Sequence, residues 1–205
     1  MQILHIHPRN PQLRLIKQAV EIINAGGVIV YPTDSAYALG CALGNVSAIE
    51  RIRKIRNLDK NHNFTLVCHD LSAIATYAYV DNPTFRLLKA TTPGPYTFIL
   101  EASKEVPRRL QHPKRKTIGL RIPDNAIVQM LLQELGAPLM SVTLILSADN
   151  IPVADPNEVS ELLENQVDLI IDGGFCGIEP TTVVEFVAGK PNILREGKGD
   201  SAIFK

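Results

Sequence analysis

The chain has 205 residues, of which 45% are apolar, a length that suits one ordinary domain or at most two. Its 21 Lys and Arg balance its 21 Asp and Glu, which excludes a uniformly basic nucleic-acid-binding coat and an acidic disordered tail. The three cysteines are scattered, which predicts reduced thiols. The sequence shows no cationic and apolar leader, and no apolar run approaches the ~20 residues that cross a bilayer. We therefore expect a soluble, cytoplasmic protein without membrane contact. Without repeats or linkers, we expect a single domain over residues 1–205.

The first third of the chain predicts two helices and two strands. Asn10-Pro11 resembles a helix N-cap followed by proline, and apolar residues then recur at helical spacing up to Ile23. Gly26-Gly27 can end that helix before an apolar strand over 28–31. A second helix is predicted over 47–54, and a strand over 64–68.

The remaining chain alternates short apolar strands with helices of roughly ten residues. Asp124 can cap a helix that ends at Leu135, and Asp155-Pro156 can open another that runs to about Asn165. The expected strands are 96–100, 117–122, 139–146, 167–171, 182–187 and 192–195. This alternation predicts the α/β class with a largely covered sheet, and the close spacing of the last strands predicts a mixed one.

Charge is segregated along the chain. Seven basic residues between Lys104 and Arg121 face one acid, a second basic cluster spans 51–60, and the segment 149–172 holds seven acids and no Lys or Arg. The basic segment can form a surface for the phosphates of a nucleotide or an RNA, or a solvated loop opposite an acidic helix of the same molecule. Because the segment 104–116 lacks Phe, Tyr and Trp, recognition of a duplex backbone fits better than stacking on a single strand.

Familiar phosphate-loop and nucleophile-elbow motifs do not occur. His5 and His7 alternate on an expected strand, but two ligands do not make a metal site, and we expect none. In YPTDSAYALG, residues 31–40, small polar residues follow the end of a buried strand, a common ligand position in α/β sheets. A simple Asx or Ser/Thr turn over 33–35 is the alternative.

Lys54 and Arg56 form a K-x-R pair at the end of the second predicted helix. On a helix, side chains two residues apart point in different directions. Lys54 and Arg56 can point the same way only if the helix has ended and the chain there is extended. Cations that favour a helix C-terminus are the alternative interpretation.

The ordered segments PTDSAYALG, KIR, HNF, PGPYTFIL, GLRIP, IDGG, PTTVVEF and ILREGKG resemble the YrdC-like family, most closely its YciO branch. The motif-bearing region covers about 14–199. The resemblance implies a twisted, open, mixed sheet with helices and a large positively charged cavity. The family includes threonylcarbamoyl-AMP synthases, nucleotidyltransferases that use threonine, bicarbonate and ATP in forming threonylcarbamoyladenosine in tRNA. Some members are described as binding double-stranded RNA or tRNA.

The resemblance also implies roles for individual residues. The catalytic positions are Lys54 and Arg56. The substrate-binding positions are Thr33, Tyr37, His62 and Arg121, the last of which would hold the carboxylate of threonine. The nucleotide-binding positions are Thr97, Ser141, Thr143, Thr181, Thr182 and Arg195. The residues expected to contact RNA are Arg108, Arg109, Lys114, Arg115 and Lys116.

The chemistry of the synthases needs fixed cations and no protein nucleophile, because negative charge gathers on a phosphate as pyrophosphate leaves. No tightly bound cofactor is implied, and ATP would enter as a substrate with Mg²⁺. We therefore expect Lys54, Arg56, Arg121 and Arg195 to line one cavity beside Thr33.

Two departures from the synthase pattern leave a second hypothesis open. The synthases carry S-x-N where this chain has Thr143-Leu144-Ile145, and the similar run 147–150 lies too late to replace it. Asn63 stands where the family usually has proline. The alternative is a non-catalytic paralogue that keeps a cationic cavity for RNA or a nucleotide.

Overall fold

A computed structural model describes residues 1–59, 62, 64–146 and 150–205. The strands are β1 (Gln2–His5), β2 (Ile29–Tyr31), β3 (Ala38–Ala42), β4 (Thr65–Val67), β5 (Tyr96–Glu101), β6 (Thr117–Arg121), β7 (Leu139–Thr143), β8 (Leu169–Asp172), β9 (Thr182–Val187) and β10 (Lys190–Arg195). The helices are α1 (Leu13–Asn24), α2 (Val46–Arg56), α3 (Leu71–Tyr77), α4 (Asn82–Thr91), α5 (Ala126–Leu135) and α6 (Pro156–Leu162), with 3-10 turns η1 (Arg108–Leu110) and η2 (Ala202–Phe204).

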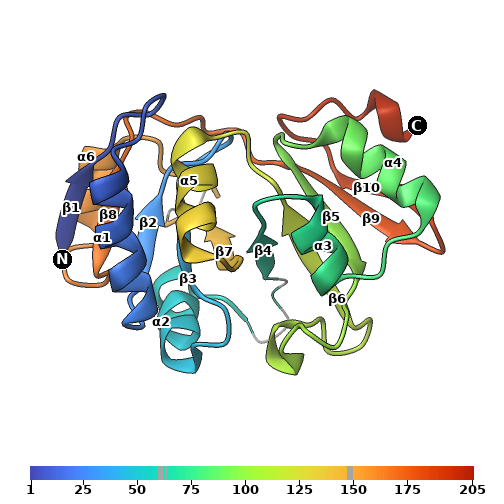
Figure 1. Cartoon of the computed structure of the whole chain (residues 1–205), viewed down its shortest axis with the longest axis horizontal. Coiled ribbons are helices and arrows are strands. Elements are labelled where there is room, and N and C mark those ends of the chain that lie inside the picture. Colours follow the sequence, from blue (N-terminus) through green and yellow to red (C-terminus); the bar gives the residue numbers. More distant parts are fainter. Residues whose placement is uncertain (60–61, 63, 147–149) are drawn as a thin grey trace.

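All ten strands belong to one open sheet, in the order β1-β8-β2-β3-β7-β4-β6-β5-β9-β10 (Figure 1). Parallel pairs join β1 to β8, β8 to β2, β4 to β6 and β5 to β9. The other neighbours are antiparallel. The predicted α/β class with an open, mixed sheet is therefore confirmed.

Helices cover the two faces of the sheet unequally. On one face, α1 and α5 pack against β1, β8, β2, β3, β7 and β4 around Ile16, Tyr31 and Leu131, and this core contains no described residue of β5, β6, β9 or β10. On the other face, α2, α3, α4 and α6 enclose a larger core with Ile52 and Phe98. Among the described residues, no helix therefore packs on the first face over strands β5, β6, β9 and β10, and the candidate site lies on this part of the face.

Several predicted boundaries shift, and three elements were missed. The Asn10-Pro11 cap is wrong: α1 begins at Leu13, because the ring of His7 accepts the backbone N–H groups of Arg9 and Asn10 in a separate turn. The cap of α5 is Asn125, not Asp124, and α6 ends at Leu162. Strand β7 ends at Thr143, three residues early. The missed elements are β3, α3 and α4.

Candidate functional site

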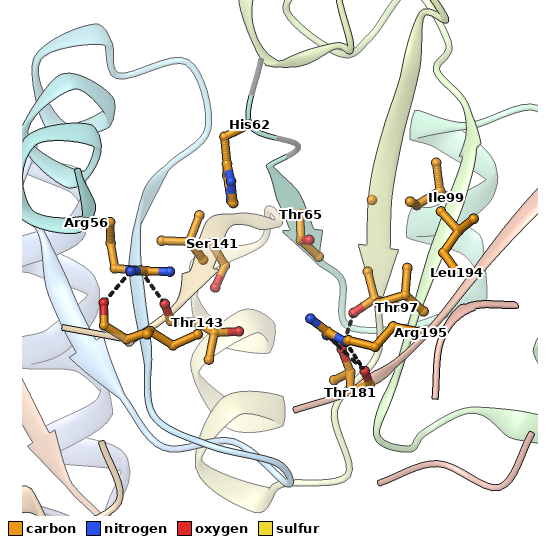
Figure 2. Close-up of a pocket in the computed structure, with 14 residues that line it drawn as sticks. Arg56, His62, Thr65, Thr97, Ile99, Ser141, Thr143, Thr181, Leu194 and Arg195 are labelled. Carbon is orange, nitrogen blue, oxygen red and sulfur yellow. Dashed lines mark hydrogen bonds between the residues drawn. The ribbon is translucent and has the colours of Figure 1, made fainter. Parts of the chain in front are cut away.

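The uncovered face of the sheet holds a cavity of about 340 Å³ (Figure 2). Four residues that are paired across neighbouring strands form its floor. Ser141 on β7 pairs with Thr65 on β4, Thr65 pairs with Gly119 on β6, and Gly119 pairs with Ile99 on β5. A Cβ at Gly119 would lie 2.8 Å from the Thr65 hydroxyl and 3.2 Å from the carbonyl oxygen of Phe64. Glycine therefore keeps this floor open where neighbouring strands come close.

Two arginines stand on opposite walls of the cavity, as Figure 2 shows. Arg56, the last residue of α2, donates from Nε to the carbonyl oxygen of Thr143 at 2.7 Å and from Nη1 to that of Ile145. Arg195, the last residue of β10, donates from Nε and Nη2 to the carbonyl oxygen of Thr181 at 3.0 and 2.9 Å. These backbone contacts fix both guanidinium groups, and one terminal nitrogen of each, Nη2 of Arg56 and Nη1 of Arg195, has no hydrogen-bond partner among the described residues.

Neither wall arginine is neutralised by a carboxylate within the part of the chain that the structure describes. Partial burial lowers the pKa of Arg56, and burial together with the nearby charge of Arg121 lowers that of Arg195. Arginine still stays protonated at neutral pH, so the cavity carries uncompensated positive charge. A site of this kind favours an anion with more than one negative charge.

Polar groups between the arginines differ in what they can still donate. Thr97 and Thr181 share a hydroxyl–hydroxyl bond of 2.8 Å, and Thr181 also accepts from Arg195 at 3.2 Å. Ser141 donates to the carbonyl oxygen of Leu39 at 3.2 Å and accepts from the buried Tyr31 hydroxyl at 2.6 Å. The Ser141 proton is thus already used, whereas its oxygen still faces the cavity.

His62 lies at the rim of the cavity, above Ser141 in Figure 2. Partial burial lowers its pKa, and the charge of Arg56 lowers it further. The imidazole is therefore neutral at pH 7 and can donate one hydrogen bond and accept another.

Two of the four expected cations do not line the cavity. Because α2 continues to Arg56, Lys54 points away and lines a separate surface hollow with Glu50 and Asn57, so the expected convergence of Lys54 with Arg56 is wrong. Arg121 is 6% exposed and is not among the lining residues. Its Nη2 donates to the carboxylate of Asp34 and to the hydroxyl of Ser35.

Three further predicted site residues bond within the protein and stay outside the cavity lining. The Thr33 hydroxyl donates to the Ala36 carbonyl at 2.6 Å and accepts two backbone N–H groups at 3.1 Å, which is the Ser/Thr turn considered above. The Tyr37 hydroxyl donates to the Gly174 carbonyl at 2.7 Å. The Thr182 hydroxyl donates to the Gly199 carbonyl at 2.5 Å.

Of the predicted nucleotide residues, Thr97, Ser141, Thr143, Thr181 and Arg195 line the cavity, as does His62 from the substrate set. Five apolar or small lining residues had not been predicted, namely Ile99, Gly119, Val142, Val183 and Leu194, and neither had Thr65 or Ile145. No local pattern marks them, since they come together only through the pairing of non-consecutive strands. Asn63 and residues 147–149 lie outside the described residues.

The expected RNA-binding side chains lie on the exposed segment around η1. Figure 1 shows this segment at the same edge of the molecule as α2, which carries the second basic cluster. Arg115 differs from the others because its Nη1 donates to Glu185 at 2.6 Å, and Glu185 is only 8% exposed. That pair ties the basic segment to β9.

Within the described ranges, no three His, Cys, Asp or Glu side chains come together as a metal site. His5 instead bonds Asp172 at 2.8 Å, and His7 accepts backbone N–H groups. No helix in the same ranges is long and apolar enough to cross a membrane.

Comparison with known proteins agrees with this architecture. The family model for Sua5, YciO and YrdC proteins, described as "Telomere recombination", matches residues 21–197. The uncharacterized protein YciO of Escherichia coli K12 is 57% identical over 97% of both chains, and the threonylcarbamoyl-AMP synthase of Homo sapiens is 31% identical over 89% of this chain and 67% of its own. The crystal structure of E. coli YciO matches with a TM-score of 0.96, covering 100% of this chain and 99% of its own at 56% identity. P. abyssi Sua5 complexed with L-threonine shares the fold, with a TM-score of 0.88 over 96% of this chain and 58% of its own at 24% identity.

Proposed function

Because the chain belongs to the Sua5/YciO/YrdC family, we propose that it is a threonylcarbamoyl-AMP synthase-like nucleotidyltransferase that binds ATP between Arg56 and Arg195. The observation that carries the proposal is the pair of uncompensated guanidinium groups facing one cavity of about 340 Å³. A triphosphate supplies the multiple negative charges that such a pair attracts. The apolar side chains of Ile99, Val183 and Leu194 offer contact area for a nucleoside.

In the proposed reaction, the neutral amino group of threonine forms an N–C bond to the carbon of bicarbonate, one C–O bond of bicarbonate breaks, and water leaves to give a carbamate. One carbamate oxygen forms a bond to the α-phosphorus of ATP while the bond to the β-phosphate oxygen breaks and pyrophosphate leaves. Arg56 and Arg195 would stabilise the charge that builds on the transferring phosphate, and their bonds to backbone carbonyls hold them ready. Mg²⁺ would enter with the triphosphate, since the described lining residues include no Asp or Glu.

Position 145 supports nucleotide binding in a different way from the S-x-N motif of the synthases. The backbone carbonyl of Ile145 accepts a bond from Arg56, so this residue orients the guanidinium even without a side-chain amide. The missing amide would cost a synthase about 1–3 kcal/mol of nucleotide binding. We therefore propose a weaker ATP site than one with asparagine, not an absent one.

The direct test is to incubate the purified protein with ATP, threonine, bicarbonate and Mg²⁺, and to measure pyrophosphate together with threonylcarbamoyl-AMP. We expect both products, and we expect Arg56→Gln and Arg195→Gln to reduce their formation by at least about tenfold. Pyrophosphate without threonylcarbamoyl-AMP would point to another acceptor. No product and no ATP binding at millimolar concentration would overturn the proposal.

Duplex RNA binding is a second candidate function, favoured by the exposed basic segment around η1 and its position at the same edge of the molecule as α2. Its affinity should fall steeply with salt, and replacing Arg108, Arg109 and Lys114 by glutamine should reduce the salt slope by about one per residue. Arg115→Gln should change the slope less, because Arg115 is already paired with Glu185. A slope unchanged in the triple variant would exclude this surface.

A further inference from the structure

A second hollow, of about 440 Å³, lies apart from the arginine cavity, and its described lining is almost entirely apolar. The lining includes Leu146, Val153, Leu162 and Ile178, with Glu158 as the one charged side chain among the described residues. Leu162 and Ile178 are large apolar side chains that remain 46% and 60% exposed. Scattered exposed apolar residues are ordinary, but several around one hollow are typical of an interaction site.

Main-chain bonds hold the walls of this hollow in place. The N–H of Val153 donates to the carbonyl of Leu144 at 3.0 Å. The N–H of Cys176 donates to the carbonyl of Ala154 at 3.1 Å, which brings the segment that carries Ile178 alongside. Because the walls are already paired, a partner that binds here does not have to order them.

The hollow is distinct from the arginine cavity, although the two are neighbours. Ile145 lines the cavity, and the next residue, Leu146, lines the hollow. The described linings of the two have no residue in common. Binding at the hollow is therefore independent of the function proposed for the cavity.

The two segments that form the hollow are strongly acidic. Three exposed glutamates lie on them, namely Glu158 and Glu161 on α6 and Glu179 next to Ile178. None of the three forms an ion pair with a described residue. The chain has no Lys or Arg between positions 150 and 189, so no neighbouring cation in this stretch compensates them.

This combination of apolar and acidic surface restricts the kind of partner that fits. A nucleic-acid backbone or an anionic lipid surface is repelled by the glutamates. A second copy of the chain could offer the basic segment around η1, but Val106 and Leu110 of that segment are buried, at 1% and 2% exposure, and cannot fill the hollow. The complement is a protein segment that carries both Lys or Arg and an exposed large apolar side chain.

We propose that the hollow beside α6 docks a basic segment of a partner protein. One large apolar side chain of that segment enters the hollow and contacts Leu162 and Ile178, as anchor residues do at the centre of an interface. Its Lys or Arg residues lie near Glu158, Glu161 and Glu179, where charge complementarity sets orientation and association rate.

The test is selection from a random peptide display library on the purified wild-type chain at low ionic strength. We expect the enriched peptides to carry net positive charge and at least one Leu, Ile, Phe or Met. A synthetic copy of an enriched peptide is then titrated by fluorescence polarisation. Leu162→Ser and Ile178→Ser should each raise its Kd by at least about tenfold.

Leu13→Ser is the matched control. Leu13 on α1 is also 46% exposed but does not line the hollow, so the Kd should stay within about twofold of wild type. Replacing Glu158, Glu161 and Glu179 together by glutamine should raise the Kd by about threefold to tenfold and flatten its dependence on salt. Urea unfolding checks each variant, and Leu162→Ser and Ile178→Ser test the hollow independently if one of them does not fold.

Several results would overturn the proposal. These are a library that yields no binder, enriched peptides that are neutral or acidic, and binding that survives both Leu162→Ser and Ile178→Ser. Sedimentation velocity distinguishes a second copy from a partner. Self-association of the wild-type chain that is lost in Leu162→Ser would assign the hollow to a homodimer and also overturn the proposal. A wild-type chain that binds these peptides but not pyrophosphate contradicts only the function proposed for the arginine cavity.

Discussion

Replacing Arg56 by glutamine tests whether an uncompensated guanidinium on the cavity wall binds phosphate. Two of its nitrogens donate to the carbonyls of Thr143 and Ile145, and Nη2 has no partner within the described part of the chain. Loss of one hydrogen bond from a charged group costs about 1.5–3 kcal/mol. The expected effect on pyrophosphate binding is therefore about 10- to 150-fold.

The electrostatic contribution leads to a similar figure. Two unit charges 4 Å apart attract by about 4 kcal/mol at an effective dielectric constant near 20. Arg56 is only half-buried, so solvent screening reduces that value toward the hydrogen-bond range. Glutamine can still donate to one of the two carbonyls, and we expect the free energy of unfolding to change by no more than about 1 kcal/mol.

The assay is calorimetric titration with pyrophosphate, alongside urea unfolding to check the fold. Arg51→Gln is the control, because Arg51 lies on the same helix but donates to Asp168 and to the carbonyl of Gln166. We expect its pyrophosphate affinity to stay within about twofold of wild type. Equal losses in the two variants, or an unaffected Arg56→Gln that is fully folded, would refute the assignment of Arg56 to the phosphate site.

Three further changes have defined outcomes. Because the pKa of His62 lies below its usual value of about 6.5, acidification from pH 8 to about 4 should add a charge to the cavity rim at a lower pH than for a free imidazole and tighten the binding of sulfate, which does not titrate there; His62→Gln should abolish this component. Tyr31→Phe removes the 2.6 Å bond to Ser141 and should lower the free energy of unfolding by about 1 kcal/mol in urea, whereas Tyr79→Phe, 61% exposed, should not. Gly119→Ala should weaken ATP binding by at least about tenfold in titration, because its Cβ crowds the cavity floor.

The elements that could be predicted from sequence are those with strong local signals. The strand before Pro32 and the helix before Gly136 follow from apolar runs and terminators. Helices α3 and α4 are short and carry few buried residues, so their apolar pattern is weak. Without that pattern, the N-cap residues Asp70 and Asp81 do not predict a helix. Strand β3 consists mostly of small residues and continues directly from the polar motif, which hides its strand character.

The site was less predictable because long-range pairing decides what each charged residue does. Family motifs assigned similar electrostatic roles to Lys54, Arg56 and Arg121. However, α2 continues two residues beyond its predicted end, which directs Lys54 away from Arg56, and Asp34 accepts from Arg121. These outcomes depend on a contact between positions 34 and 121 and on where a helix ends. Neither is a property of a local sequence window.

The location of counter-ions separates the arginines that hold this fold together from those that remain for a ligand. Arg51, Arg115 and Arg121 each form an ion pair with a carboxylate from a distant part of the chain. Arg56 and Arg195 donate to backbone carbonyls, which orient a guanidinium without cancelling its charge. Orientation without neutralisation is what a phosphate site requires, since an internal carboxylate would have to be displaced at a cost in affinity. Arg121 belongs with the neutralised arginines, because its Nη2 donates to the carboxylate of Asp34 and its side chain stays outside the cavity lining.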